Sequence, residues 1–322
     1  MKKTLIALAA VAATGAAFAQ SSVTLYGVAD ASLAKVTGQS AYLSSAGTMN
    51  NGTSRWGVRG TEDLGGGLKA GFNFEQGVSL NDGSLSKAGG GEFGRAAWMN
   101  LSGGFGELRL GRTLNPSFYA AAAWELTGTA NYSVVFSQFQ NFGATNPMGQ
   151  SITGGLRNSS QIAYTTPNMG GFSATLGYIL KGNTANEKAK VDLNLIYANG
   201  PLAVAMGYNK VQDAEKNVHV GGKYNFGAFT LAGGYLDPAG ESKGFTIGGS
   251  MPLGPVNLVV DVARDTEFKD TDLLVEVKYP LSKRTFAYGA FLRDGKKKNG
   301  ALGAATAGKD VNGLGLGIRH NF

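Results

Sequence analysis

The sequence predicts an all-β fold, a 16-stranded antiparallel transmembrane β-barrel with a long third loop folded into its lumen. Three observations predict it. Residues 313–322 alternate strictly between small or polar and bulky side chains, and the chain ends on Phe322. Segments with the same period of two follow one another along the rest of the chain. Short turns alternate with longer polar connections, as in a barrel that faces two compartments.

The N-terminus indicates export. Lys2 and Lys3 precede an apolar stretch from Leu5 to about Ala13, and residues 17–19 form a small-residue cleavage site. We therefore expect a signal peptide at residues 1–19 and one barrel domain at residues 20–322. The apolar stretch is too short for a spanning helix, which needs about 20 residues, so the expected location is the bacterial outer membrane.

The composition agrees with an aqueous barrel. Glycine accounts for 50 of 322 residues, against an ordinary share of about 7%, and charged residues are only 16%. The chain has no cysteine, which excludes disulfides, thiolate metal sites and cysteine nucleophiles. Loss of Lys2 and Lys3 would lower the net charge from +7 to +5. On an exported chain, this basic balance favours small anions or lipid headgroups as partners, not nucleic acid.

Each strand is bounded by turn residues such as Gly, Pro, Asn and Asp. The expected strands lie at 23–34, 53–62, 67–78, 92–102, 106–112, 157–166, 171–181, 189–199, 202–211, 216–226, 228–236, 243–252, 256–264, 271–280, 284–293 and 311–322. One row of each strand is expected to face lipid. Two such rows are Ala174/Leu176/Tyr178/Leu180 and Phe286/Tyr288/Ala290/Leu292.

The segment 113–156 is too long for a passive connection in a compact fold, because loops of such length are usually functional or disordered. Its aromatic residues argue against disorder. These are Phe118, Tyr119, Trp124, Tyr132, Phe136, Phe139 and Phe142. We expect this loop to enter the lumen and to narrow the pore.

Several motifs carry a family resemblance. They are the SVTLYG start at 22–27, the SRWGVRGTEDLG block at 54–65, LGR at 110–112 and the terminal Phe322. Together they resemble the trimeric Gram-negative porins of beta-proteobacteria, and most of all the anion-selective porins of the Comamonas and Delftia group. The resemblance implies a homotrimer of water-filled channels for passive diffusion of small hydrophilic solutes. It also implies that the third loop constricts each channel and that basic residues of the early strands face it.

The alternation of side chains along each strand, here called strand parity, supports part of what the resemblance implies about basic residues facing the channel. Arg55, Arg95 and Arg157 have the opposite parity to Trp56, Trp98 and Ile162, which are expected to face lipid. Parity predicts that Arg59 lies on the same face of the wall as Arg55, and it leaves the direction of Arg112 open. The expected pore constriction therefore comprises Arg55, Arg59, Arg95, Arg112, Arg157 and, from the long loop, Glu125.

Charge decides the expected selectivity. Parity turns Arg55, Arg59, Lys69, Arg95, Arg109 and Arg157 inward on the first six strands, against Asp30, Glu75 and Glu107. Glu125 is the one acidic residue of segment 113–156, so the sequence predicts anion selectivity. Alternatively, these arginines pair with Glu75 and Glu125 and only brace the loop. Arg319 is expected near the other end of the lumen, where it should matter less.

Three other functions stay open. The first is a substrate-specific channel for phosphate or organic acids, and the second is a surface adhesin. The third is an outer-membrane enzyme, but only His219 and His320 could serve as a base, and neither has a carboxylate at a recognised spacing. We therefore expect no enzyme, no cofactor and no metal site. Residues 296–298 are three lysines, which are either simply solvated or attract anions and lipopolysaccharide phosphates.

Overall fold

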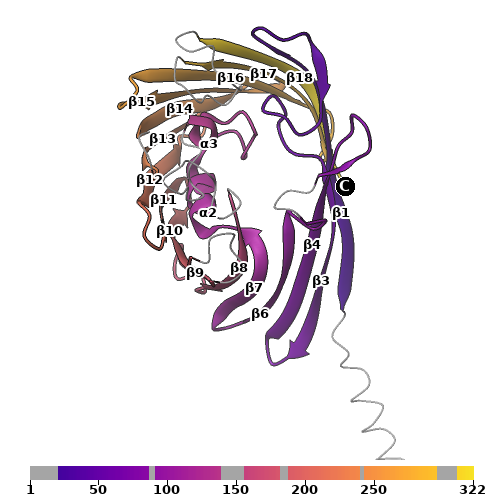
Figure 1. Ribbon diagram of the computed structural model, residues 1–322, viewed down its shortest axis with the longest axis vertical. Coiled ribbons are helices and arrows are strands. Elements are labelled where there is room, and N and C mark those ends of the chain that lie inside the picture. The colour runs from indigo at the N-terminus through magenta and orange to yellow at the C-terminus, as the bar shows by residue number, and fades with distance from the viewer. Residues whose placement is uncertain (1–20, 87–90, 139–155, 182–187, 240–242, 296–309) are drawn as a thin grey trace, which may run out of the picture.

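The computed structural model describes residues 21–86, 91–138, 156–181, 188–239, 243–295 and 310–322. The predicted signal peptide and the three lysines at 296–298 lie outside the described residues. In the described part, 18 strands form one antiparallel sheet, and all but the short strands β2 and β5 make up the barrel wall. Figure 1 shows the wall as a ring of strands around two short helices.

The wall strands have the following bounds: β1 (Ser22–Val36), β3 (Arg55–Gly65), β4 (Leu68–Val78), β6 (Ala96–Gly103), β7 (Gly106–Leu114), β8 (Arg157–Thr165), β9 (Phe172–Ile179), β10 (Lys190–Asn199), β11 (Leu202–Val211), β12 (Lys216–Asn225), β13 (Thr230–Asp237), β14 (Gly244–Leu253), β15 (Val256–Asp265), β16 (Asp270–Pro280), β17 (Thr285–Asp294) and β18 (Val311–Asn321). All sixteen predicted strands are confirmed. The start of β6 differs most, at residue 96 instead of 92. The prediction missed β2 (Tyr42–Ser44) and β5 (Leu85–Ser86), which extend the edges of β1 and β4.

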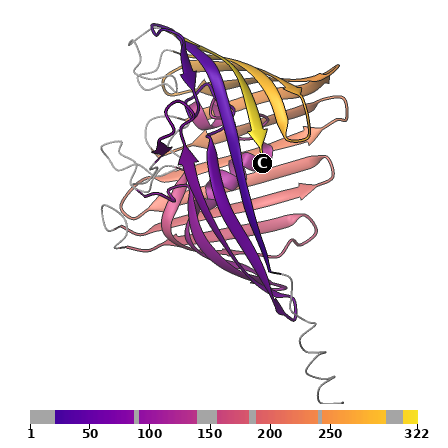
Figure 2. The ribbon, with the colours of Figure 1, turned by 90° about the vertical axis from the view of Figure 1, so that its right-hand side faces the viewer.

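The first and last strands close the barrel. Residues 28–36 of β1 pair with residues 313–321 of β18, while residues 22–28 of β1 pair with β3. Gly27 and Phe322 complete this seam, because each backbone N–H donates to the carbonyl oxygen of the other, at 3.0 and 3.1 Å. In the side view of Figure 2 the C-terminus accordingly lies beside β1.

The wall has the alternation predicted for the last strand. The side chains of Leu314, Leu316 and Ile318 are about half exposed on the outer face, while Gly313 and Gly315, which alternate with them, are buried on the inner face. The predicted outer row of β9 is confirmed in the same way, with Leu176 52% and Tyr178 45% exposed. Apolar side chains thus face lipid along most of the wall.

The predicted outer row of β17 is wrong. Tyr288, Ala290 and Leu292 are at most 4% exposed, and the Tyr288 hydroxyl donates to Asp30 across the interior at 2.6 Å. Phe291, between them, is the lipid-facing residue. Both faces of this strand are apolar, because its inner face is covered by loop residues and not by water.

Two helices lie inside the ring in Figure 1, between β7 and β8 in the chain. Helix α2 (Pro116–Trp124) starts with Asn115 as N-cap, whose side chain accepts from the Phe118 N–H, and with a proline in its first turn. It contacts β9 to β12, and α3 (Val134–Gln138) contacts β15 and β16. Phe139 and Phe142 lie outside the described residues. Among the described residues, no helix is long and apolar enough to cross a membrane.

The closing seam yields the first prediction. A Cβ at Gly27 would lie 2.3 Å from Cζ of Phe322 and 2.6 Å from the Arg55 carbonyl oxygen, so Gly27→Ala should displace the terminal ring. Overpacking of this kind costs about 1–3 kcal/mol. We expect the variant to convert from the compact to the unfolded gel band at a lower temperature. Gly289→Ala is the control, since its Cβ would meet only Cδ2 of Leu316, at 3.3 Å. Equal transition temperatures would contradict the seam.

Candidate functional site

The third loop is fixed to the inner wall at the first turn of α2. The Ser117 N–H donates to Asp192 at 2.8 Å, and the Asn194 side chain donates to the Pro116 carbonyl at 2.8 Å. Nε2 of His219 lies 3.0 Å from the Ser117 carbonyl oxygen. All three wall residues are buried. His219 therefore contacts the backbone of the loop, which gives it a structural role and no support for the enzyme hypothesis.

The other end of α2 is fixed by Trp124. This side chain is 1% exposed and lies over two glycines of neighbouring strands, Gly221 of β12 and Gly234 of β13. An added Cβ would come within 2.2 Å of Cε2 at Gly221 and within 2.7 Å of Cη2 at Gly234. The indole can pack on the wall only because both positions lack a side chain.

Glu125 organises the turn that follows α2. Its carboxylate accepts from the Thr127 N–H at 2.9 Å, from the Thr127 hydroxyl at 2.7 Å and from the Thr129 N–H. The residue is 3% exposed. The one acid of the third loop is thus engaged in the loop itself and makes no described contact with an arginine.

Arginines gather on the opposite part of the wall around a single carboxylate, Glu75 of β4. Nε of Arg55 lies 3.3 Å from Oε2, and Nε of Arg95 lies 2.7 Å from Oε1. Nε of Arg157 donates to the Arg95 carbonyl oxygen at 2.9 Å. Three of the predicted residues therefore lie together, with three guanidinium groups around one carboxylate. We call Arg55, Arg95, Arg157 and Glu75 the arginine cluster.

Arg59 extends this surface along β3. Its guanidinium lies over the ring of Tyr26, 4.9 Å from the centroid. The Tyr26 hydroxyl in turn donates to Glu75 at 3.0 Å and to Asn73 at 2.9 Å. Tyr26 can lie against the wall because Gly57 has no side chain, since a Cβ there would be 2.7 Å from Cζ of the ring. Arg59 thus shares the face of Arg55, as parity predicts.

Parity left the direction of Arg112 open, and in the structure this residue has partners of its own. The strand register aligns Arg112 with Ala97 and Ala97 with Phe74, whose ring is 42% exposed on the lipid face. The Arg112 guanidinium donates to the Gly94 carbonyl oxygen and to Ser159, so we leave it out of the arginine cluster.

Trp98, which was expected to face lipid, lies on the inner face under the guanidinium of Arg109, 4.4 Å from the ring centroid. Arg95 nevertheless reaches Glu75, because it precedes the first residue of β6 and does not follow that strand's alternation.

The tip of the first loop, between β1 and β3, also bonds to the inner wall. The Asn50 side chain and the Gly52 N–H donate to the two oxygens of Asp30, at 2.8 and 2.9 Å. Asp30 is fully buried and accepts a third bond from Tyr288. The first loop therefore narrows the lumen as well, which local sequence did not reveal.

Arg319 of β18 lies at this same level and not at the far end of the lumen. Its Nη1 donates to Asn51 at 2.8 Å. A Cβ at Gly52 would lie 3.0 Å from Nη1 of Arg319 and 3.9 Å from Nη1 of Arg55, so both guanidinium groups flank this loop tip. Parity does turn Arg319 inward. The predicted position of Arg319 along the barrel axis was wrong, because the sequence did not show that the first loop folds inward and contacts this residue.

The first and third loops meet over a buried acid, Glu276 of β16. The Tyr132 hydroxyl donates to it, and Asn51 donates to both the Tyr132 hydroxyl and Glu276. Nζ of Lys278 lies 2.9 Å from Glu276 and donates to the Thr127 carbonyl. Burial, and then the nearby carboxylate, raise the pKa of the Tyr132 phenol, so the hydroxyl stays protonated and donates.

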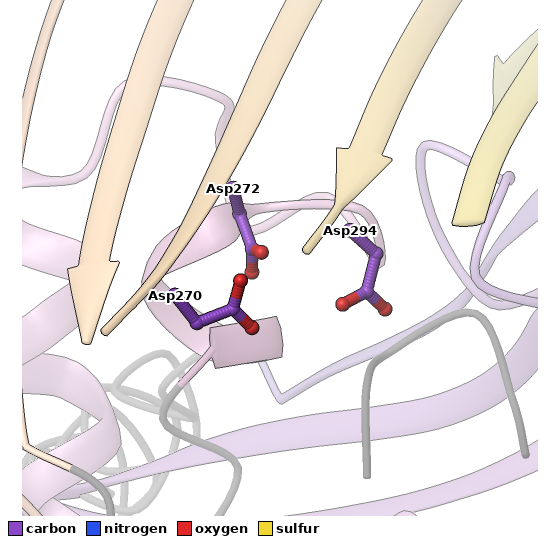
Figure 3. A group of neighbouring side chains, drawn as sticks. All are labelled: Asp270, Asp272 and Asp294. Carbon is purple, nitrogen blue, oxygen red and sulfur yellow. The ribbon is translucent and has the colours of Figure 1, made fainter. Parts of the chain in front are cut away.

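A separate acidic group lies at the ends of β16 and β17. Figure 3 shows the carboxylates of Asp270, Asp272 and Asp294 near one another, with candidate ligand oxygens all within 4.8 Å. The N–H groups of Thr271 and Gly295 donate to Asp270 and Asp272. Backbone donors therefore already stabilise two of the three carboxylates, and we assign no ion to the group.

Comparisons with known proteins agree with this geometry. Residues 4–299 match the model of the Gram-negative porin family. The outer membrane porin protein 32 of Delftia acidovorans is 37% identical over the full length of both chains, and an outer membrane porin protein of Bordetella pertussis is 31% identical over the full length of both. Among solved structures, the anion-selective porin from Comamonas acidovorans has a TM-score of 0.75 at 32% identity, covering 94% of this chain and all of the other.

The packing of Trp124 on Gly221 and Gly234 yields the second prediction. Gly221→Ala should push the indole, and α2 with it, off the wall and toward the lumen. We expect single-channel conductance in a planar bilayer to fall. Gly249→Ala is the matched control, because a Cβ there meets Cδ2 of Leu231 at 3.3 Å on the outer face and the Thr230 carbonyl oxygen at 3.5 Å, which is an ordinary contact distance. Unchanged conductance in a correctly folded Gly221→Ala channel would show that α2 does not limit the passage.

Proposed function

Since the chain belongs to the Gram-negative porin family and forms an outer-membrane barrel, we propose that its channel passes small hydrophilic solutes and prefers anions at a constriction between the arginine cluster and the third loop. The observation that carries this proposal is the gathering of three guanidinium groups around one carboxylate. At the same level, Arg319 adds a fourth. Any ion that passes here meets a surplus of positive charge.

Small energies suffice for such a preference. A potential of about 0.7 kcal/mol per unit charge enriches an anion about threefold and depletes a cation about threefold, hence about tenfold in ratio. Two unit charges 4 Å apart interact by about 4 kcal/mol at an effective dielectric of 20. The surplus in the arginine cluster is therefore large enough, even after partial screening by water and salt.

The third loop supports a positive field at the constriction because it contributes few acidic residues. Within 113–156 the sequence has one acid, Glu125, and its carboxylate accepts hydrogen bonds from Thr127 and Thr129. The interpretation in which Glu125 pairs with arginines finds no contact among the described residues. Pairing with Glu75 does occur for Arg55 and Arg95, so these arginines both brace the wall and leave net positive charge.

We propose a homotrimer as the working assembly. The outer face of β3 and β4 supports it with an aromatic group in which Phe93 contacts both Trp56 and Phe74, with ring centroids 6.4 and 5.4 Å apart. Such a patch suits contact with another protein wall as well as with lipid. Lipopolysaccharide and small anions are the proposed partners at the outer rim and in the lumen, and no enzymatic step is part of the proposal.

The arginine cluster yields the third prediction. Changing Arg55, Arg95 or Arg157 to Gln should lower the chloride-to-potassium permeability ratio about two- to threefold each, because each change removes one positive charge from a confined aqueous path. Glu at the same position should lower it further. The measurement is the reversal potential of the purified channel in a planar bilayer under a KCl gradient.

Two control variants test whether the change in permeability ratio comes from the charge of the arginine cluster. Glu75→Gln should raise the ratio, since it removes the negative charge. Arg109→Gln should change it least, because the strand register aligns Arg109 with Gly71, four residues along β4 from Glu75. Selectivity of the unmodified channel should also fall with salt, as the Debye length shrinks from about 30 Å at 0.01 M to about 3 Å at 1 M. A preference for potassium at low salt would refute anion selectivity, while a ratio unaffected by all three arginine variants would move the filter elsewhere.

A further inference from the structure

A cavity of about 290 Å³ lies between the first and third loops. Residues 46–48 and Thr53 line it from the first loop, and Phe118, Phe136 and residues 129–131 line it from the third. Both loops are bonded to the inner wall, so the cavity lies inside the barrel. Its two sides differ in chemistry.

One side is aromatic. The rings of Phe118 and Phe136 are stacked, with centroids 5.0 Å apart and planes 20° from parallel. They come from α2 and α3, so two separate elements bring the pair together. Phe136 keeps part of its surface accessible, and Leu156 adds apolar surface at the same cavity. A flat apolar group can therefore lie against this wall.

The other side is cationic. The carbonyl oxygen of Thr53, which lines the cavity, accepts from Nη1 of Arg55 at 2.9 Å. Gly52, the preceding residue, lies next to Nη1 of Arg319. Neither arginine lines the cavity itself, but both guanidinium groups lie next to the loop tip that forms its first-loop side. Guanidinium groups bind carboxylates through paired, charge-assisted hydrogen bonds.

We infer that this cavity binds aromatic monocarboxylates of the benzoate type during their passage, ahead of small aliphatic carboxylates. A benzoate can place its carboxylate at the guanidinium groups and its ring against Phe136. Chloride and acetate use only the cationic side, and an uncharged arene uses only the aromatic side. The inference rests on the proposed anion-selective function and adds a preferred solute class to it.

The test measures how added carboxylates reduce the chloride current of the native channel in a planar bilayer. We expect the half-blocking concentration of benzoate to be about fivefold lower than that of acetate, because ring contacts of this kind are worth a factor of about two to ten. The block should saturate with concentration, as binding at a discrete site requires. Reversal potentials in KCl are recorded on the same channels.

Three variants locate the site. Phe136→Leu removes the ring but keeps apolar bulk, so it should raise the half-blocking concentration of benzoate about threefold and leave that of acetate unchanged. Phe136→Tyr retains the ring and should behave like the native chain. Trp98→Leu removes another inner-face ring, the one under Arg109, and should have no effect on benzoate block.

The outcomes separate the two proposals. Equal block by benzoate and acetate, with chloride preference intact, would overturn the benzoate site and leave the anion channel standing. The same holds if Trp98→Leu, and not Phe136→Leu, weakens the block. A reversal potential that shows no chloride preference would instead overturn the proposed function itself. Gel mobility before and after heating confirms that each variant is folded.

Discussion

The pairing of β1 with β18 is the constraint on which the rest of the structure depends. In hydrocarbon, an unpaired backbone group costs several kcal/mol, so an open edge on this wall is excluded. Closure gives every strand one lipid face and one lumenal face. All polar chemistry of the chain is thereby confined to the interior and to the two rims. The arrangement of charges inside follows from how the loops occupy that interior.

The interior divides into two unequal parts. On β10 to β12, buried polar side chains such as Asp192 and Asn194 meet the backbone needs of the third loop, and β16 supplies Glu276 to the Tyr132 hydroxyl. The hydrogen-bonding capacity of these wall residues is therefore used by the loops. On β3 and β4, by contrast, the tip of the first loop contacts Arg55 but leaves 22% of the Arg55 side chain and 14% of the Glu75 side chain exposed. The charges of this second part remain accessible to a passing solute.

Period-two patterning was sufficient to predict the sixteen wall strands, because a lipid face and a lumenal face alternate along each strand. It failed where the inner face is covered by protein. The inner row of β17 is apolar because Tyr288 and its neighbours contact the loops. No local signal separates such a row from a lipid-facing one, since both exclude water.

Parity also fails where a strand is irregular. Asn158 and Gln161 are three residues apart, which strict alternation would place on opposite faces, yet their side chains bond at 2.6 Å. A register shift between β7 and β8 and a positive φ of 52° at Ser160 account for this. The inward bend of the first loop onto Asp30 was equally hidden, since it depends on long-range contacts. The structure nevertheless brings together Arg55, Arg95 and Arg157, three of the arginines that parity turns inward.

The balance in the arginine cluster explains why it contains a carboxylate at all. Guanidinium groups as close as those of Arg55 and Arg95 repel each other, and an acid between them offsets this repulsion while holding both in fixed geometry. A second acid would lower the surplus of the arginine cluster from two positive charges to one and weaken the field. One carboxylate for several arginines is thus the smallest number that orders the groups and still leaves positive charge. Arginine suits this position better than lysine, since its planar group stays charged when partly buried and can share one acceptor with a neighbour.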